Sequence, residues 1–402
     1  MTKFTAGFTG AKTPPRLVTL VILAGSSVMP MNIFLPVLPL IGEDLNVSDA
    51  VAQYVLTVFL GAIAIAQLAI GPMADRFGRR PVLLVTLSLF LVGTIVCTFA
   101  PTIEWLLFGR VLQASSAASI ALSRAIVRDL YDREKAASMI GYVTMAMAII
   151  PMLSPSIGGY IGGAFGWRAT FGFLIFSGII VLAVVFLDLG ETHTPKRNSI
   201  RAQAADYWTL LREPTVWGYL GTAALASGAY FSFLAGAPLV GLKIVNITPE
   251  ALGIYFGTVA LGYIFGNFLS GRYSERIGIE QMMLYGGITA SLAIVVSLWL
   301  MLTFEPKAYY LFGPMTLVGM GNGMVLPNAN AGAVSVRPDL AGSASGLGGF
   351  LQIGGGALLA IAAGNLISVE NNAIPRYLIM LLSSVLGTIV SLWMYRHVMR
   401  SH

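Results

Sequence analysis

Long apolar stretches separated by short polar loops make up almost the whole chain. Twelve of them are long enough to cross about 30 Å of hydrocarbon at about 1.5 Å of helix rise per residue. The sequence therefore predicts an all-α membrane protein with twelve transmembrane helices, which leaves both termini on one side of the membrane. The expected spans cover roughly residues 17–40, 51–70, 82–100, 103–127, 136–165, 167–187, 215–240, 251–269, 281–302, 308–329, 340–366 and 374–394.

One polar loop between two spans recurs at half the chain length. Residues 71–81 read Gly-Pro-Met-Ala-Asp-Arg-Phe-Gly-Arg-Arg-Pro, and residues 271–278 repeat the pattern. Asp75 matches Glu275, Arg76 matches Arg276, and Gly78 matches Gly278. This repeat predicts two pseudo-symmetric six-helix halves. We expect the halves at 1–190 and 214–402, joined by a cytoplasmic linker at 191–213 whose amphipathic segment either lies along the headgroups or docks a partner.

The basic residues of the loops are distributed unevenly between the two predicted sides. With both termini in the cytoplasm, 19 of the 24 Lys and Arg residues fall inside. This asymmetry follows the positive-inside rule and predicts a multi-pass protein of a bacterial inner membrane with both termini cytoplasmic. Arg110 falls within a span, and the outer side holds only Arg168, Lys243, Lys307 and Arg376.

Composition narrows the class of protein further. The chain is 56% hydrophobic and only 10% charged, which excludes an ordinary soluble domain. The basic excess gathers in short loops between spans, so nucleic acid is not an expected partner. The single cysteine, Cys97, allows neither an internal disulfide nor a cysteine metal cluster. No pattern of a nucleophile with its base, a metal site or a phosphate loop is present, so we expect no enzyme, no cofactor and no metal.

Several motifs together are similar to one family of carriers. The two halves, the repeated loop and the arginine in the fourth span resemble the major facilitator superfamily, and nearest within it the twelve-helix drug:proton antiporters of the bicyclomycin/chloramphenicol resistance group. The resemblance implies multidrug efflux by alternating access, with membrane lipid around the protein and a monomer sufficient for the mechanism. The motifs that carry it lie at residues 32–39, 109–113, 125–131, 151–159, 327–330 and 341–346.

The same resemblance implies a conformational switch at the cytoplasmic loops. Asp75 would face the start of the eleventh span when the cavity opens outward, and Arg79 and Asp129 would complete a charge relay. The alternative is that these charges only mark the cytoplasmic face. In the fifth span, Ser154 replaces the first glycine of the family's antiporter motif, so the remaining motif supports either antiport or a kink needed only for packing. The expected gating residues are Asp75, Arg76, Arg79, Asp129, Glu275, Arg276, Pro155, Gly158 and Gly159.

Arg110 is the strongest candidate for contact with a transported molecule. It lies about seven residues into the fourth span, where a bare guanidinium costs at least a few kcal/mol. We expect it to face a central cavity beside Gln113, one turn away. The alternative is a structural role, in which carbonyls of the first span and Asn32 satisfy it. The expected substrate-binding residues are Arg110, Asn32, Gln113, Tyr54, Tyr142, Tyr230, Phe233, Asn267 and Asn328, although each aromatic could instead serve packing.

No acidic residue falls at the middle of any predicted span. Antiporters of the resembled group usually carry a carboxylate where this chain has Asn32, and asparagine cannot titrate. Proton coupling therefore needs Asp129 or Glu104 or a protonated substrate; otherwise transport is uncoupled or exchanges solutes. An organic cation beside Arg110 would lack a counter-ion, so we expect neutral or anionic amphipathic substrates. The alternative function is import or exchange of a small organic anion with Arg110 as its clamp.

Overall fold

The computed structural model describes residues 15–131, 139, 143, 150, 153–192, 200–337, 340–366 and 374–401. Every regular element in these ranges is helical. Ten of their helical segments are long and apolar enough to cross a membrane. The 29-residue helix α14 (Ala308–Val336) packs along α12 (Pro249–Ile277) and α13 (Ile279–Thr303) in the position of a further predicted span. The predicted span at 136–165 lies mostly outside the described residues, and its part at 153–165 is helical.

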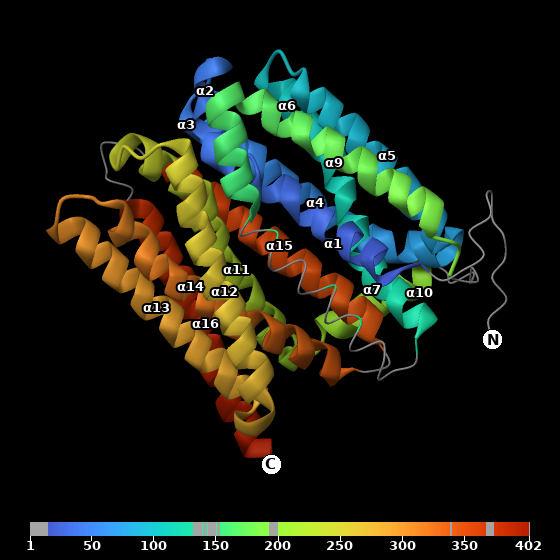
Figure 1. The fold of residues 1–402 in the computed structure, drawn as a ribbon. Coiled ribbons are helices and arrows are strands. Elements are labelled where there is room, and N and C mark those ends of the chain that lie inside the picture. The colour runs from blue at the N-terminus through green and yellow to red at the C-terminus, as the bar shows by residue number, and fades with distance from the viewer. Residues whose placement is uncertain are drawn as a thin grey trace.

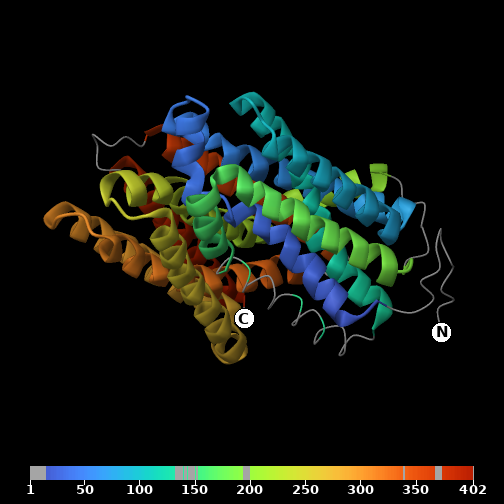
Figure 2. The same ribbon diagram turned by 45° about the horizontal axis from the view of Figure 1, so that its top comes forward.

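The helices before the linker form one bundle, shown in blue to green in Figures 1 and 2. Prolines interrupt its first span, because a proline ring cannot continue the backbone ladder: Pro36 opens the 3-10 turn η1 (Leu35–Val37), and Pro39 lies in the first turn of α2 (Leu38–Asp44). The other elements of this bundle are α1 (Leu17–Asn32), α3 (Asp49–Ala52), α4 (Tyr54–Phe77), α5 (Arg79–Thr98), α6 (Ile103–Gln113), the 3-10 turn η2 (Ala114–Ser116), α7 (Ala117–Leu130), residues 153–165 and α9 (Trp167–Asp188).

The helices after the linker form a second bundle, in yellow to red (Figures 1 and 2). It contains α12, α13, α14, α11 (Pro214–Leu239), the π-helical turn η3 (Val240–Ile244), α15 (Ala341–Leu366) and α16 (Ile374–Ser401). The linker helix α10 (Ile200–Leu211) lies between the bundles in sequence, and α15 packs along α4 across their boundary. The division at residues 190 and 214 stays a prediction. We call the end that holds residues 71–81 the hairpin end, and the other the α2 end.

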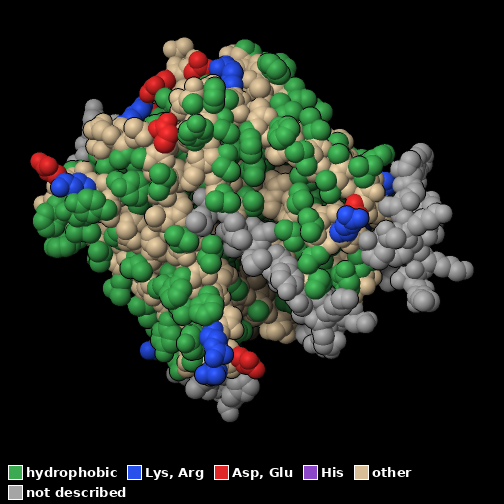
Figure 3. All heavy atoms as spheres, in the orientation of Figure 1, with side chains coloured by type: hydrophobic (Ala, Val, Ile, Leu, Met, Phe, Trp, Pro, Cys, Tyr) green, Lys and Arg blue, Asp and Glu red, His purple; other side chains and the backbone are tan. Residues whose placement is uncertain are grey.

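Apolar side chains cover the outside of both bundles. Val85, Phe176, Leu292 and Leu358 are each more than half exposed, as expected for helices that face hydrocarbon rather than water. In Figure 3, hydrophobic side chains spread over the middle of the visible face, while charged side chains gather near its edges. The surface is therefore that of a protein surrounded by lipid.

Glycines let α12 and α14 meet backbone to backbone. A Cβ added at Gly266 would lie 3.0 Å from the Cα of Gly323, and one added at Gly323 would lie 2.7 Å from the backbone nitrogen of Asn267. Small residues allow such close approach between membrane helices. At these glycines the two helices therefore meet with almost no side chain between them.

Candidate functional site

The Arg110 side chain is completely buried inside the first bundle. Its Nε donates to the Val55 carbonyl on α4 at 2.9 Å, and its Nη1 donates to the Pro30 carbonyl on α1 at 2.9 Å. Nη1 also donates to Oε1 of Gln113 at 2.8 Å, one turn further along the fourth span. Backbone carbonyls of two neighbouring helices therefore hold the guanidinium, and Gln113 holds it from its own helix.

Two aromatic rings enclose the same guanidinium. The Cζ of Arg110 lies 3.9 Å from the ring centroid of Phe59 and 4.4 Å from that of Phe34. Ring faces attract cations, most strongly where water is excluded. Nη2 of Arg110 has no hydrogen-bond acceptor, and no carboxylate among the described residues bonds to this arginine. The Nη2 edge of the guanidinium thus keeps donors that no described group of the protein accepts.

Gln113 and Asn32 differ in how far their side-chain amides are engaged by hydrogen bonds. Nε2 of Gln113 donates to the Thr94 hydroxyl at 2.9 Å, so both ends of this amide are engaged within the protein. Nδ2 of Asn32 donates to the Val28 carbonyl of its own helix at 3.0 Å, and no bond joins Asn32 to Arg110. The structure thus agrees with one part of the structural role considered for Arg110, the bond to a carbonyl of the first span. It does not agree with the other part, a bond to Asn32.

The candidate residues of the second bundle lie in two groups. Tyr230 and Phe233 of α11 belong to an aromatic cluster, in which the Phe233 ring centroid is 5.8 Å from those of Phe256 and Phe312 and 6.5 Å from that of Tyr230. Asn267 and Asn328 lie on the adjacent helices α12 and α14.

The two asparagines have protein partners. Nδ2 of Asn267 donates to the Tyr263 carbonyl at 2.8 Å, and Nδ2 of Asn328 donates to the Ser270 hydroxyl at 2.8 Å. Tyr54 begins α4 and is partly exposed, and Tyr142 lies outside the described residues. The structure thus groups the candidates by bundle, with the buried arginine in the first and the aromatic cluster in the second.

Polar contacts also join the bundles at the α2 end. Nζ of Lys243, beyond α11, lies 2.8 Å and 3.0 Å from the two carboxylate oxygens of Asp49 on α3. The Ser156 hydroxyl donates to the Gly253 carbonyl of α12 at 3.1 Å. An ion pair and a hydrogen bond therefore join the two bundles here.

The glycines predicted in the fifth span lie at this same junction. A Cβ added at Gly158 would collide with the Ile33 backbone, and one added at Gly159 would collide with the Pro249 carbonyl. A Cβ added at Gly253 would in turn lie 2.5 Å from the Pro155 carbonyl. The missing side chain of Gly158 thus allows close packing within the first bundle, and those of Gly159 and Gly253 allow the two bundles to come together at the α2 end.

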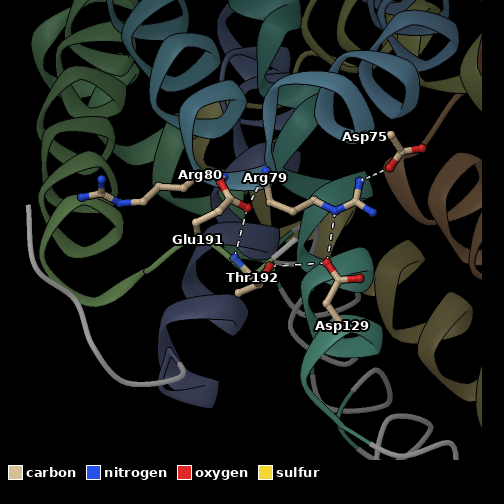
Figure 4. Close-up of polar contacts among 6 residues, drawn as sticks. All are labelled: Asp75, Arg79, Arg80, Asp129, Glu191 and Thr192. Atoms are coloured by element: carbon tan, nitrogen blue, oxygen red, sulfur yellow. Dashed lines mark hydrogen bonds and ion pairs between the residues drawn. The ribbon is translucent and has the colours of Figure 1, made fainter. Parts of the chain in front are cut away.

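A charged cluster lies at the hairpin end of the first bundle (Figure 4). Nη1 of Arg79 is 2.8 Å from Oδ1 of Asp75, and Nε of Arg79 is 3.2 Å from Oδ2 of Asp129 on α7. The Thr192 hydroxyl donates to the same Asp129 oxygen at 3.4 Å. Arg79 therefore bridges the two aspartates, and the structure records no bond from Asp75 to a described residue of α15.

Glu191 belongs to this cluster although sequence reasoning did not single it out. Its carboxylate accepts from the backbone N–H of Arg79 at 2.9 Å and of Arg80 at 3.2 Å (Figure 4). These amides have no acceptor within their own helix and lie at the positive end of the α5 dipole, so a carboxylate there is favourable. The sequence signal for it was an acid four residues after the predicted sixth span.

The remaining gating candidates are solvent-exposed. Arg76, Glu275 and Arg276 all lie on the surface at the hairpin end. The Cζ of Arg76 is 5.3 Å from the Phe77 ring centroid. Among the ion pairs found in the described residues, none includes these three side chains.

Long lipid-facing helices in two bundles, a buried arginine and a charged cluster at one helix end define a polytopic membrane transporter. Residues 20–360 match the Major Facilitator Superfamily, and the chain belongs to this family. The sequence-based resemblance and the all-α membrane fold class are thereby confirmed.

Similar proteins come from several bacteria. An uncharacterized MFS-type transporter, YdgK, of Bacillus subtilis (strain 168) is 31% identical over 90% of this chain and 90% of its own length. A bicyclomycin resistance protein homolog of Haemophilus influenzae is 30% identical over 85% of this chain and 87% of its own. The fold is similar to that of a bacterial homolog of the human lysosomal transporter Spinster, solved in an inward-facing and occupied conformation. That similarity has a TM-score of 0.74 and 17% identity, covering 94% of this chain and 96% of that one.

Proposed function

We propose that this transporter exports small amphipathic molecules from the cytoplasm by alternating access, and that its substrates are neutral or anionic. The observation that carries the proposal is Arg110, which is fully buried and bonded to carbonyls and an amide rather than to a carboxylate of the described chain. The name of the bicyclomycin resistance homolog supports export of antibiotic-like compounds.

Electrostatics explains why the substrate class follows from this arginine. A guanidinium held by neutral groups keeps its full charge, and the surrounding apolar core screens it poorly. A cationic substrate would be repelled and would lose its hydration without gaining a counter-ion. A neutral molecule avoids this cost, and an anion gains from the unused Nη2 donor.

The two ends of the molecule supply a mechanism for alternating access. Opening the α2 end requires breaking the Lys243–Asp49 ion pair and separating Gly159 from Pro249 of the second bundle. We infer that Asp75 then leaves Arg79 and docks at the start of α15, where the helix dipole favours a carboxylate by roughly 0.3 to 1 kcal/mol. Arg76, Glu275 and Arg276 complete this gate at the membrane surface.

The surroundings follow from the same proposal. The protein lies in a bacterial inner membrane with lipid around both bundles and both termini in the cytoplasm, as the basic loops favour. It acts as a monomeric carrier, catalyses no reaction, and uses neither cofactor nor metal. Protons are the candidate coupling ion, with Asp129 or Glu104 as the titrating group, since Asn32 cannot bind and release a proton.

The second candidate function is import or exchange of a small organic anion. The free Nη2 edge of Arg110 favours it, because that edge suits a carboxylate better than an uncharged group. Direction of transport and charge of substrate are separate questions, so one experiment can test both.

Flux into and out of proteoliposomes under an imposed pH gradient tests the proposal. Chloramphenicol, benzoate and a permanently charged ammonium dye serve as neutral, anionic and cationic probes. We expect chloramphenicol or benzoate to move against its gradient when the pH gradient is imposed, and the dye to be a poor substrate. Arg110→Gln should lower benzoate flux by at least about tenfold, whereas Arg168→Gln, at an exposed arginine beside Asp44, should leave it unchanged. The dye as best substrate would contradict the proposal.

A further inference from the structure

A second fully buried arginine lies in the other bundle. Arg376, in the first turn of α16, has no exposed surface. Its Nε, Nη1 and Nη2 atoms all lack a hydrogen-bond acceptor in the structure as described. The nearest recorded partner is the ring of Tyr377, whose centroid is 4.7 Å from Cζ. A guanidinium with five unpaired N–H donors is costly to bury, so this group requires an explanation.

Its neighbours on α11 follow from the register of two antiparallel helices. The Ser383 hydroxyl of α16 donates to the Leu225 carbonyl of α11 at 2.6 Å, and a Cβ added at Gly228 would lie 3.1 Å from that hydroxyl. A step of seven residues toward the α2 end is about two helical turns and returns to the same face of each helix. This step leads from Ser383 to Arg376 on α16 and from Leu225 to Ser232 on α11. Ser232 is also fully buried, and its hydroxyl also lacks a partner. The register thus predicts that the unsatisfied donors of both helices lie at about one level.

No ion pair found among the described residues joins an acid of this end to Arg376, neither the unpaired Glu43, Glu104, Glu250 and Glu305 nor the two paired aspartates. Asp44 pairs with Arg168, and Asp49 pairs with Lys243. A guanidinium offers a planar fork of donors that matches the two oxygens of a carboxylate, sulfonate or phosphate, and a hydroxyl adds one further donor. A neutral ligand would leave the charge uncompensated, and a cation would be repelled.

We propose that Arg376 and Ser232 form an oxyanion-binding site at the α2 end of the second bundle, separate from Arg110 in the first. Its ligand is a small oxyanion, either the head of a soluble organic acid or the phosphate of an anionic lipid. The site is sealed while the α2 end is closed by the Lys243–Asp49 pair, and it gains access when that end opens. This inference does not depend on the direction of transport or on the role of Arg110.

Binding to the purified full-length protein tests the site with two matched probe pairs. Benzoate and benzamide, measured by calorimetry, share a ring and differ in charge. Phosphatidylglycerol and phosphatidylethanolamine, measured by native mass spectrometry, differ in net charge. We expect wild type to prefer the anion in at least one pair, and the pair that shows the preference identifies the source of the ligand.

Variants then assign any preference to these residues. Arg376→Gln should weaken binding of the preferred anion by at least about tenfold and leave binding of the other member of that pair unchanged. Ser232→Ala should weaken it by roughly threefold to tenfold. Arg168→Gln is the matched control at an exposed arginine of the same end and should change nothing. Arg110→Gln separates the two sites, because it should impair flux while leaving binding at Arg376 intact.

Two results would overturn the site. The first is that the wild-type protein shows no preference for the anion in either pair. The second is that Arg376→Gln binds the anion as tightly as the wild type does. If Arg376→Gln does not fold, Arg376→Lys decides, because it keeps the charge and loses the fork. A severalfold loss of anion affinity in Arg376→Lys supports the site, and unchanged affinity contradicts it.

Discussion

The two copies of the repeated loop share one backbone and carry different chemistry. In the first copy, α4 ends at Phe77, and Gly78 turns the chain at φ 98° and ψ 156°. In the second, α12 ends at Ile277, and Gly278 turns it at φ 91° and ψ 149°. The glycine N–H bonds four residues back in both, at 3.0 Å and 2.9 Å. The next helix follows at once in each copy.

The side chains after the glycine differ completely. Arg79 in the first copy bridges Asp75 and Asp129, whereas Ile279 takes its place in the second. The start of α13 is instead held by a hydrogen bond from the Tyr219 hydroxyl to Glu280 at 2.5 Å. A turn needs only the shared glycine, while a switch needs charges that can exchange partners. We therefore expect the first loop to be the main conformational switch and the second loop to contribute less to gating.

Neutralising the matched acids should give the largest contrast between the loops. Asp75→Asn removes the carboxylate that pairs with Arg79 and should slow transport by at least about tenfold, or about 1.4 kcal/mol in the barrier. Glu275→Gln should slow transport by less than about threefold, since Glu275 is exposed and has no recorded ion pair to lose. Proteoliposome flux gives both rates, and size-exclusion profiles check folding. Wild-type flux in Asp75→Asn would refute the switch.

Adding a methyl group to each glycine separates backbone strain from crowding. Both turns lie in a region open almost only to glycine, so each alanine should cost about 1 to 3 kcal/mol. At Gly78 the new Cβ would also collide with the Glu191 carboxylate, whereas at Gly278 the nearest atom is 3.8 Å away. Gly78→Ala should therefore melt at a lower temperature than Gly278→Ala in detergent. Equal melting temperatures would show that Glu191 moves aside freely.

The smallest expected contrast concerns the charge at the start of the following helix. Glu191→Gln weakens the bonds to the Arg79 and Arg80 amides and should cost about 1 kcal/mol of stability. Glu280→Gln keeps an oxygen for the Tyr219 hydroxyl and should cost less than about 0.5 kcal/mol. Thermal unfolding compares the two variants, and a larger loss in Glu280→Gln would reverse the comparison.

The loops also show which features a sequence can predict. Gly78 and Gly278 were identifiable because a turn depends on residues adjacent in the chain, and the repeat marked both. Glu191 was missed because it meets Arg79 from 112 positions away. Arg110 was expected to face a central cavity beside Gln113, which does accept from it, but its other two acceptors are backbone carbonyls, which every residue carries and no pattern marks.

Position along a helix misled the interpretation of Arg376. Arg376, near the predicted start of the last span, was assigned to the outer side of the membrane, and nothing in its position indicated the complete burial that the structure shows. Snorkelling from a helix end is the usual expectation for a long basic side chain. Which way such a side chain turns depends on the space left by neighbouring helices, and small residues such as Gly228 and Ser232 of α11 are distant in sequence.

The glycine seam between α12 and α14 restricts where selectivity can be altered. Because the Gly266 and Gly323 backbones touch, these two positions offer no side chains whose exchange could reshape a pocket. Any larger residue there would wedge the pair apart instead of changing what is recognised. Engineering for new compounds should therefore target the rings of Tyr230 and Phe233 on α11 and leave the seam untouched.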